Sequence, residues 1–415
     1  MSNQIRWFVG IDWASEQHRV ALLDAGGNRI DEWQVTHSGA ELGQLCDRLL
    51  AQTGAQPCEI AVAIETPRGP VVETVLERGF ELYSINPKQL DRFRDRFTVA
   101  GAKDDSRDAH VLAASLRTDC VAFRRITLDD PLIIELREWV RIHDELSNER
   151  TRLTNRMRDQ LWRYYPQVTK LGDDLGAEWN LELWEQVPAP EKAAQVTEKT
   201  LARILKKHRI RRIDSAEALR ILRQAPISVA PGTIDAATAH IRTLIARLRL
   251  ANELIKHAQR QLDELCSKIE ACAAGQICEQ HDMSILRSFA GLGRTNIATL
   301  LAEACEPLRR RDYHALRMLS GVAPVSRRSG KKWLVLRRYA CNKRLAVAVF
   351  HWARVAIQHD PISRNRYAAL RQRGHSHGRA LRTVGDRLLY VLCTLLERQT
   401  LFVPGYRNPQ PAAET

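Results

Sequence analysis

Four carboxylate side chains stand where a divalent metal ion could be bound. Asp12 closes the apolar run WFVGID, and Glu65 closes the run IAVAIE. Asp105 and Asp108 lie three residues apart in KDDSRDAHVLAASL, a spacing that puts both on one face of a helix. Oxygen ligands of this kind suit Mg²⁺ or Mn²⁺, which stabilise in-line displacement at phosphate. The four residues therefore predict a metal site for phosphodiester chemistry.

Each carboxylate also has a structural interpretation. Asp12 could be a turn residue, and Asp105 or Asp108 could favour a helix N-terminus through the helix dipole. Glu65 could cap a helix that begins near Pro67. It is the hardest of the four to explain structurally, because an unpaired carboxylate after an apolar strand is destabilising unless a cation or a donor compensates it.

The elements that must position these residues follow from the alternation of apolar residues and turn formers. Three short β-rich runs predict a meander, and a helix, a buried strand, a second helix and a fifth strand follow it. This order is that of the ribonuclease H fold, in which adjacent strands bring Asp12 and Glu65 together. The segments are Trp7–Asp12, Arg19–Asp24, Ile30–Val35, Ala40–Leu50, Ile60–Glu65, a helix opened by Pro67, and Glu81–Ile85.

The middle of the chain predicts two long amphipathic helices. Apolar residues recur at helical spacing from Leu136 to Leu161 and from Ile241 to Ile269. These helices could form a coiled-coil arm that joins two chains, or they could pair within one chain, because periodicity does not distinguish the two. Between them, residues from about 166 to 235 form a polar segment with several prolines and tryptophans.

Charge is concentrated at one end of the 415-residue chain. The formal net charge is +14, and residues 284–398 hold 23 basic and 6 acidic residues, whereas residues 1–125 hold 15 and 18. A segregated basic segment predicts a nucleic-acid-binding surface. Nine scattered cysteines argue against a disulfide framework, and no run is long and apolar enough for a membrane span. We therefore expect a soluble, cytoplasmic protein with no membrane partner.

A glycine turn within the basic segment predicts phosphate binding. In SFAGLGRTNIATLLA, Gly291 and Gly293 separate two amphipathic stretches, and Arg294 follows them. This pattern is typical of a helix-hairpin-helix, in which glycines admit the phosphate backbone to free helical N–H groups. A plain turn between two helices fits the same residues.

A serine among cations follows in GVAPVSRRSGKKWLVLRR. Ser329 stands before Gly330 in a predicted loop, and the surrounding cations are suited to phosphate. A serine there could be a nucleophile, but hydrogen bonding to phosphate is by far the more common role of a serine in a basic loop, and Ser326 is a candidate too. The basic residues that we assign to nucleic-acid binding here are Arg327, Arg328, Lys331, Lys332, Arg337 and Arg338.

Together these motifs resemble the insertion-sequence family one-ten of transposases, the bridge-RNA-guided recombinases. The matching pieces are GIDWA, IETP, KDDSRDA, AGLG, GVAPVSRRSG and GHSHGRALRTVGDRLLYVL, in the family's order. The resemblance implies a RuvC-like domain with a DEDD metal site built from Asp12, Glu65, Asp105 and Asp108, which bind Mg²⁺ or Mn²⁺. It also implies Ser329 as the nucleophile, because this serine precedes Gly330. Asp104 is the alternative to Asp105.

The expected fold class is α/β followed by α. We expect a RuvC-like domain over residues 1–125, a helical coiled-coil region over 126–283 with an insertion at about 166–235, a basic helical transposase domain over 284–400, and a tail over 401–415. The expected function is cutting and rejoining donor and target DNA under guidance of a bridge RNA, by a homodimer or homotetramer. A metal-dependent nuclease without a serine nucleophile and a non-catalytic nucleic-acid-binding protein are the alternatives.

Overall fold

A computed structural model describes residues 5–96, 105–127, 130–272, 277–330 and 332–404. The chain divides into two compact units, residues 1–130 and residues 131–415. No helix in the described ranges is long and apolar enough to cross a membrane.

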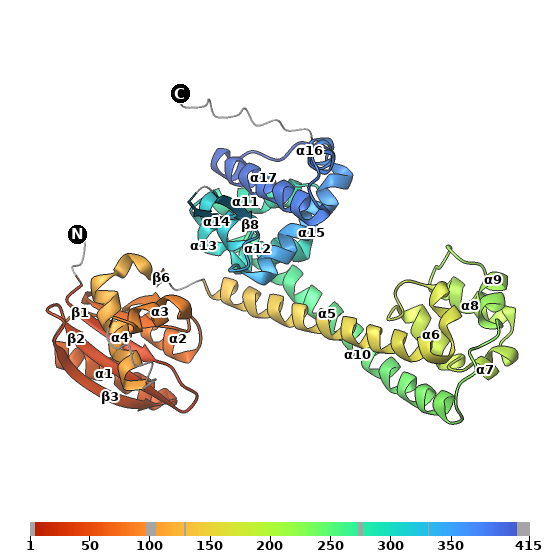
Figure 1. The fold of residues 1–415 in the computed structure, drawn as a ribbon, viewed down its shortest axis with the longest axis horizontal. Coiled ribbons are helices and arrows are strands. Elements are labelled where there is room, and N and C mark those ends of the chain that lie inside the picture. Colours follow the sequence, from red (N-terminus) through yellow and green to blue (C-terminus); the bar gives the residue numbers. More distant parts are fainter. Residues whose placement is uncertain (1–4, 97–104, 128–129, 273–276, 331, 405–415) are drawn as a thin grey trace. The chain divides into compact units, whose positions relative to one another are not determined.

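Unit 1 is built on a six-stranded mixed sheet in the order β3-β2-β1-β4-β5-β6 (Figure 1). Strand β1 pairs antiparallel with β2 and parallel with β4, while β2 pairs antiparallel with β3. The predicted meander and the predicted fourth and fifth strands are thus confirmed. The strands are β1 (Trp7–Asp12), β2 (Gln17–Asp24), β3 (Arg29–Thr36), β4 (Ile60–Ile64), β5 (Glu81–Ser84) and β6 (Arg124–Ile126).

Helices cover both faces of this sheet. Apolar residues of α1 (Gly39–Thr53) and α2 (Pro70–Glu77) share a core with the odd-numbered residues of β1, Val9 and Ile11. Residues of α3 (Pro87–Arg94) and α4 (Asp105–Thr118) share a second core with Phe8, on the opposite face. Two 3-10 turns, Pro57–Glu59 and Cys120–Ala122, complete the unit.

The helix expected at Pro67 begins three residues later. Gly69 has a φ of 101° and precedes the first helical residue, Pro70, so the turn needs the glycine and the proline fixes the first helical φ. Two prolines, Pro67 and Pro70, lie close together here, and the helix begins at the second. Helix α3 and the three-residue strand β6 were not expected from the sequence.

The contact between α4 and β1 depends on a glycine. A Cβ atom on Gly10 would lie 1.9 Å from the carbonyl oxygen of Ala109 and 2.7 Å from the backbone nitrogen of Ala113. Only a residue without a side chain admits the helix at this separation. Helix α4 therefore crosses β1 in backbone contact, two residues before Asp12.

Unit 2 contains two long helices that pair with each other. They are α5 (Pro131–Tyr164) and α10 (Thr233–Cys272). The side chain of Arg150 donates to Asn252 at 2.7 Å, and Leu136 shares a core with Leu262 and Leu265. As residue numbers increase along α5, the numbers of the contacting residues on α10 decrease, so the two helices run antiparallel. The two predicted helices are confirmed, and their apolar stripes face each other within one chain.

The segment between them folds as a small helical cluster on the far ends of α5 and α10. Its core surrounds the fully buried Trp184 and includes Met157 and Leu244 from the long helices. The tyrosine hydroxyl of Tyr164 donates to the carbonyl of Pro188 at 2.6 Å, which satisfies a buried polar group. The elements are a 3-10 turn (Pro166–Leu171), α6 (Glu178–Gln186), α7 (Pro190–Gln195), α8 (Glu198–Lys207) and α9 (Ser215–Leu222).

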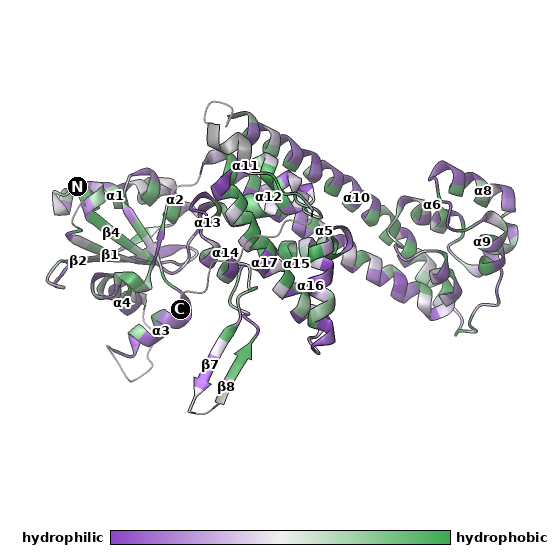
Figure 2. Cartoon of the chain, turned by 90° about the horizontal axis from the view of Figure 1, so that it is seen from above, coloured by the Kyte–Doolittle hydropathy of each residue, from purple (hydrophilic) through white to green (hydrophobic). Residues whose placement is uncertain are grey.

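The remaining elements form a helical bundle with one β-hairpin, and the near ends of α5 and α10 join the same core. Trp352 is fully buried at the centre of the bundle, with the ring of Phe289 edge-on at 5.2 Å. The hairpin projects from the helices, and its second strand is mainly apolar (Figure 2). The elements are α11 (Ile277–Ser288), α12 (Arg294–Glu303), α13 (Cys305–Arg309), α14 (Tyr313–Leu319), β7 (Val325–Ser329), β8 (Lys332–Leu336), α15 (Lys343–His359), α16 (Pro361–Gln372) and α17 (His377–Arg398).

Replacing Gly10 with alanine should destabilise unit 1. The new methyl group would overlap the backbone of α4, so we expect a loss of about 3 kcal/mol. Hydrogen exchange of peptides covering β1 and α4 measures this local stability. Gly43→Ala is the matched control, because Gly43 lies inside α1 with its nearest neighbour 3.9 Å from the new Cβ, and it should be neutral or slightly stabilising. Equal exchange in wild type and Gly10→Ala would contradict the close contact.

Candidate active site

Two of the predicted carboxylates follow the ends of neighbouring strands. Asp12 is the last residue of β1, and Glu65 directly follows β4. The parallel register pairs Gly10 with Ala63 and Ile11 with Ile64, so the next position of each strand is Asp12 and Glu65. Both residues continue the face of the sheet on which α4 packs, because side chains alternate between faces along a strand.

The N-terminal end of α4 points toward the end of the sheet at which β1 and β4 finish. The last turn of α4 lies at the opposite end of these strands, where Arg117 donates to the carbonyl of Ala25 at 3.3 Å, in the turn after β2. Asp108, in the first turn, is therefore directed toward the end of β1 that carries Asp12. Its side chain is almost fully buried. The fold thus presents three of the four predicted carboxylates to one end of the sheet.

Asp108 is held by an arginine that the sequence reasoning missed. The Nε and Nη2 atoms of Arg94 donate to the two carboxylate oxygens of Asp108 at 2.6 and 2.8 Å. Burial disfavours the charged guanidinium, but the hydrogen bonds and charge of Asp108, with Asp91 and Glu65, raise the pKa of Arg94. A fixed cation therefore neutralises this carboxylate in the protein alone.

The structure describes only some of the four carboxylates of the expected metal site. Asp105 is the first residue of α4, its side chain lies outside the described residues, and so does all of Asp104. Among the side chains that the structure describes, no three acidic, histidine or cysteine residues lie close enough together to hold a metal ion. The donors are oxygen atoms of the kind that Mg²⁺ prefers, but Asp108 must exchange its arginine to join them.

A histidine pair lies beside Asp12. The buried ring of His18 forms a hydrogen bond with His37, with 2.9 Å between Nε2 and Nδ1, and its Nδ1 accepts from the amide of Ala14 at 3.3 Å. Burial, together with the charge of His37, lowers the pKa of His18 and so favours its neutral form. This histidine pair fixes the turn after Asp12. In the sequence, the only sign of it is His18, a polar residue at a buried position of β2.

Ser329 lies at the end of a strand and not in a loop as expected. It is the last residue of β7, is exposed, and pairs with Lys332 across the hairpin. Gly330 follows with a φ of 53°, which a tight hairpin turn requires. Ser326 is three residues away on the same strand, so the two serines point to opposite faces. The sequence pattern SRRSGKK concealed the strand because almost all of its residues are polar.

The hairpin and the segment after it carry several exposed arginines. Arg327 and Arg328 are exposed on β7, and neither forms an ion pair with a described acidic residue; the same holds for Arg337 after β8. Arg338 donates to the carbonyl of Ala323 at 3.3 Å. Lys331 lies outside the described residues, as does the side chain of Lys332. Unpaired exposed guanidinium groups are suited to phosphate.

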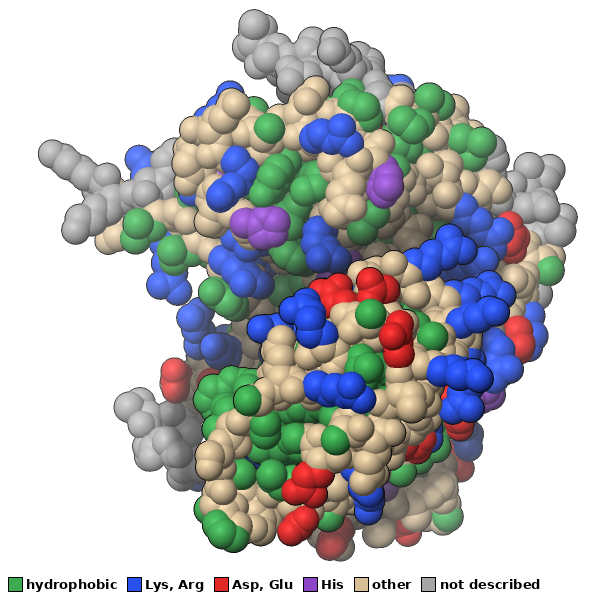
Figure 3. Space-filling model, turned by 90° about the vertical axis from the view of Figure 1, so that its right-hand side faces the viewer, with side chains coloured by type: hydrophobic (Ala, Val, Ile, Leu, Met, Phe, Trp, Pro, Cys, Tyr) green, Lys and Arg blue, Asp and Glu red, His purple; other side chains and the backbone are tan. Residues whose placement is uncertain are grey.

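The α6–α9 end of unit 2 differs in charge from the hairpin. Basic and acidic side chains are interspersed on the face that Figure 3 shows. Arg249 is an example, since its guanidinium contacts Glu178 at 2.8 Å and also pairs with Glu185. Residues 126–283 hold equal numbers of basic and acidic residues. The excess of basic over acidic residues is therefore concentrated in residues 284–398.

The AGLG turn joins α11 to α12, and its two glycines differ. A Cβ atom on Gly291 would lie 2.8 Å from the backbone nitrogen of Ala356, so this glycine serves packing against α15 and not approach to phosphate. Gly293, by contrast, precedes α12 with no atom within 4 Å of the position of a Cβ. Arg294 is exposed and contacts Asp263 at 3.0 Å. Packing against α15 thus explains why residue 291 is a glycine, and its approach to phosphate stays a prediction.

Replacing Arg94 with methionine should destabilise unit 1 by about 2 to 4 kcal/mol, because Asp108 would remain buried without its partner. Methionine keeps the apolar stem and removes only the guanidinium. Urea denaturation followed by tryptophan fluorescence measures the change. Arg92→Met, on the exposed side of the same helix, should stay within about 0.5 kcal/mol of wild type. Two variants of equal stability would show that the Arg94–Asp108 pair is not structural.

Comparison with known proteins identifies the family. Residues 9–166 match the model of a transposase family named for its DEDD motif and IS110, and residues 283–368 match the transposase IS116/IS110/IS902 family. The IS117 mini-circle protein of Streptomyces coelicolor is 32% identical over 95% of both chains, and the 43.6 kDa protein of insertion element IS110 from the same organism is 26% identical over 95% of both. The y4uE protein of Sinorhizobium fredii is 56% identical over 54% of this chain, a match that spans 63% of that protein. The chain therefore belongs to the IS110 family of transposases, enzymes whose substrate is DNA.

Proposed function

We propose that this transposase cuts and rejoins DNA at element ends and target through a serine nucleophile, Ser329, and a Mg²⁺ or Mn²⁺ site. The observation that carries the proposal is the position of Ser329 at the tip of a projecting hairpin. Ser329 is exposed, and the two arginines before it form no ion pair with a described acidic residue. A serine at such a tip can reach the phosphate of a DNA strand that lies on the basic surface.

The chemistry assigned to Ser329 is transfer of a phosphodiester. Its Oγ atom forms a bond to phosphorus, the bond from phosphorus to one strand oxygen breaks, and the hydroxyl proton ends on the leaving strand or in solvent. Arg327 and Arg328 are placed to stabilise negative charge on the phosphate. The reverse reaction with another strand end rejoins DNA and releases the serine.

Asp12, Glu65, Asp105 and Asp108 are the residues proposed to hold the metal. When bound, the metal would polarise the phosphate and help to activate the attacking hydroxyl. The direction of α4 and the register of β1 and β4 support the assignment of Asp12, Glu65 and Asp108. Arg94 acts as a substitute cation for Asp108 in the protein alone, so metal binding requires its displacement.

The finer fold assignments also belong to this proposal. We assign a RuvC-like ribonuclease H fold to residues 1–125, a coiled-coil region to 126–283, and a transposase domain with a helix-hairpin-helix to 284–400. The strand order with β1 between β2 and β4 supports the first, and the antiparallel pair α5 and α10 supports the second. For the third, the open turn at Gly293 is the supporting feature.

The proposed partners are donor and target DNA, a bridge RNA from the same element, and further copies of the chain, all in the cytoplasm. The resemblance of the motifs is the basis for the bridge RNA. Leu250 and Leu254 support an oligomer, a dimer or tetramer, because they are exposed one turn apart on α10 although α5 already covers another face. In such an oligomer the serine of one copy could act with the metal site of another.

Ser329→Ala should abolish any covalent link between protein and DNA while DNA binding is retained. The substitution removes the attacking oxygen and leaves the neighbouring arginines in place. Denaturing electrophoresis of the full chain with labelled element-end DNA and bridge RNA detects the adduct. Ser326→Ala is the matched control on the opposite face of β7 and should form the adduct normally.

An adduct that persists in Ser329→Ala would contradict the serine assignment. Cleavage by this variant without an adduct would instead support a nuclease that uses only metal ions. Either result leaves the family assignment unchanged, because that rests on the whole chain.

A further inference from the structure

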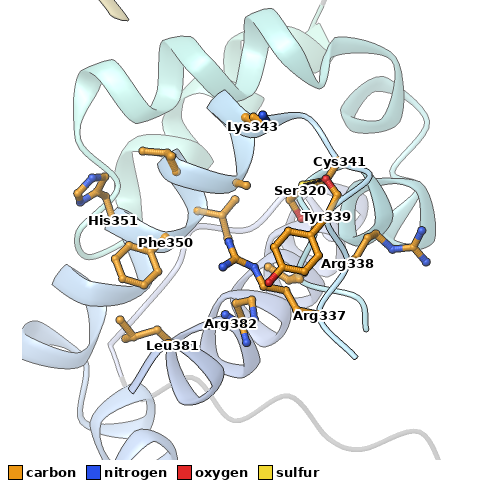
Figure 4. Close-up of a pocket in the computed structure, with 16 residues that line it drawn as sticks. Ser320, Arg337, Arg338, Tyr339, Cys341, Lys343, Phe350, His351, Leu381 and Arg382 are labelled. Carbon is orange, nitrogen blue, oxygen red and sulfur yellow. Dashed lines mark hydrogen bonds between the residues drawn. The ribbon is translucent and has the colours of Figure 1, made fainter. Parts of the chain in front are cut away.

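A pocket of about 500 Å³ lies in the C-terminal bundle at the base of the hairpin (Figure 4). Its volume is within the range of roughly 300–1,000 Å³ typical of small-ligand sites. Four elements line it: the end of α14 with the residues that follow, the segment after β8, the first half of α15, and the first turns of α17. The residues on which the argument depends are Arg337, Tyr339, Phe350, Leu381 and Arg382.

Three arginines line this pocket, and two of them, Arg337 and Arg382, carry the argument. Arg382 lies partly buried on α17, and neither it nor Arg337 forms an ion pair with an acidic residue in the described ranges. Burial lowers the pKa of Arg382, and the positive charge of Arg337 lowers it further. An anion would stabilise two cations that repel each other in a partly enclosed site.

The rest of the pocket is aromatic and apolar. Tyr339 is 76% exposed, and the guanidinium of Arg337 lies 5.1 Å from the centre of its ring. Phe350 of α15 and Leu381 of α17 form other parts of the lining, as Figure 4 shows. A flat ring system could stack on Tyr339 while its charged end meets the arginines.

The pocket is continuous with the strand that follows Ser329. Val325 pairs with Leu336 at the base of the hairpin, and Arg337 is the next residue along the chain. Ser329 lies four residues from this base, about 13 Å at 3.3 Å per residue. A DNA strand held in the pocket would therefore pass Ser329 within a few nucleotides of the held position.

We propose that this pocket binds one unstacked nucleotide of a DNA strand, with its phosphate on Arg337 and Arg382 and its base against Tyr339 and the apolar lining. Arginines and aromatic side chains are the groups with which proteins hold unpaired bases. The inference deepens the proposed function: the site fixes the strand that Ser329 attacks. It rests on that function for the identity of the strand but not for the chemistry of the pocket.

Photocrosslinking tests the proposal. The probe is a single-stranded oligodeoxynucleotide that contains 5-iodouracil, which crosslinks to nearby aromatic side chains, and the protein is the full chain. Mass spectrometry should place the main crosslinks on Tyr339 or Phe350. Arg382→Gln should reduce them at least tenfold, whereas Arg379→Gln, which removes an exposed charge one turn away and outside the pocket, should change them less than twofold.

The same variants separate a binding role from a structural one. Without ligand, Arg382→Gln should melt at or above the temperature of wild type, because it removes a repelled, partly buried cation. A marked fall in melting temperature would show that Arg382 is structural and would overturn the proposal. So would crosslinks confined to other residues, or equal losses in both variants.

Failure of the pocket can be distinguished from failure of the proposed function. A chain that binds the oligonucleotide but crosslinks elsewhere overturns the nucleotide pocket alone, and Ser329 keeps its role. A chain that crosslinks at Tyr339 but forms no serine adduct with element DNA supports the pocket and contradicts the nucleophile.

Discussion

The backbone contact between α4 and β1 is the constraint on which the site in unit 1 depends. At Gly10 the helix lies so close to the strand that a methyl group would overlap Ala109. This contact sets the height of α4 over the sheet, and the bond from Arg117 to Ala25 sets its direction. These two contacts place Asp108 at the end of the sheet where Asp12 and Glu65 follow β1 and β4.

The two proposed sites, in unit 1 and in the C-terminal bundle, differ in the sign of their charged residues. In unit 1 a carboxylate is buried and already holds a cation, the guanidinium of Arg94. In the C-terminal bundle the situation is reversed, because Arg327, Arg328 and Arg382 form no ion pair with a described acidic residue. Under the proposed function, the first site would bind a metal ion in place of the arginine, and the second would bind the phosphates of nucleic acid.

Buried strands with apolar runs were predictable, and exposed, polar or very short strands were not. The pattern IAVAI fixed β4 because every side chain is buried between two helical layers. The strand β7, with its sequence VSRRS, carries no such alternation, since it projects from the bundle and buries little. For β6, three residues are too few for any periodic signal. A strand was thus predictable from the sequence when its buried side chains produced a recognisable apolar pattern.

The candidate site followed the same rule. Asp12 and Glu65 were found because each ends a buried strand, whereas Arg94 lies on a short helix of mainly polar residues and gave no signal. The pocket could not be predicted, because its arginines come from segments far apart along the chain, after β8 and on α17. Spacing in a sequence reports local geometry, and sites assembled across a bundle need the tertiary structure.

Binding of Mn²⁺ to the protein without nucleic acid tests the central claim most directly, namely that the end of this sheet is a metal site. Electron paramagnetic resonance measures free Mn²⁺ as it is titrated into the full chain. We predict saturable uptake by wild type, its loss in Asp12→Asn, and normal uptake in Asp24→Asn, whose carboxylate lies at the other end of the sheet and accepts from Asn28. Equal uptake by wild type and Asp12→Asn, or no uptake by wild type, would contradict the account.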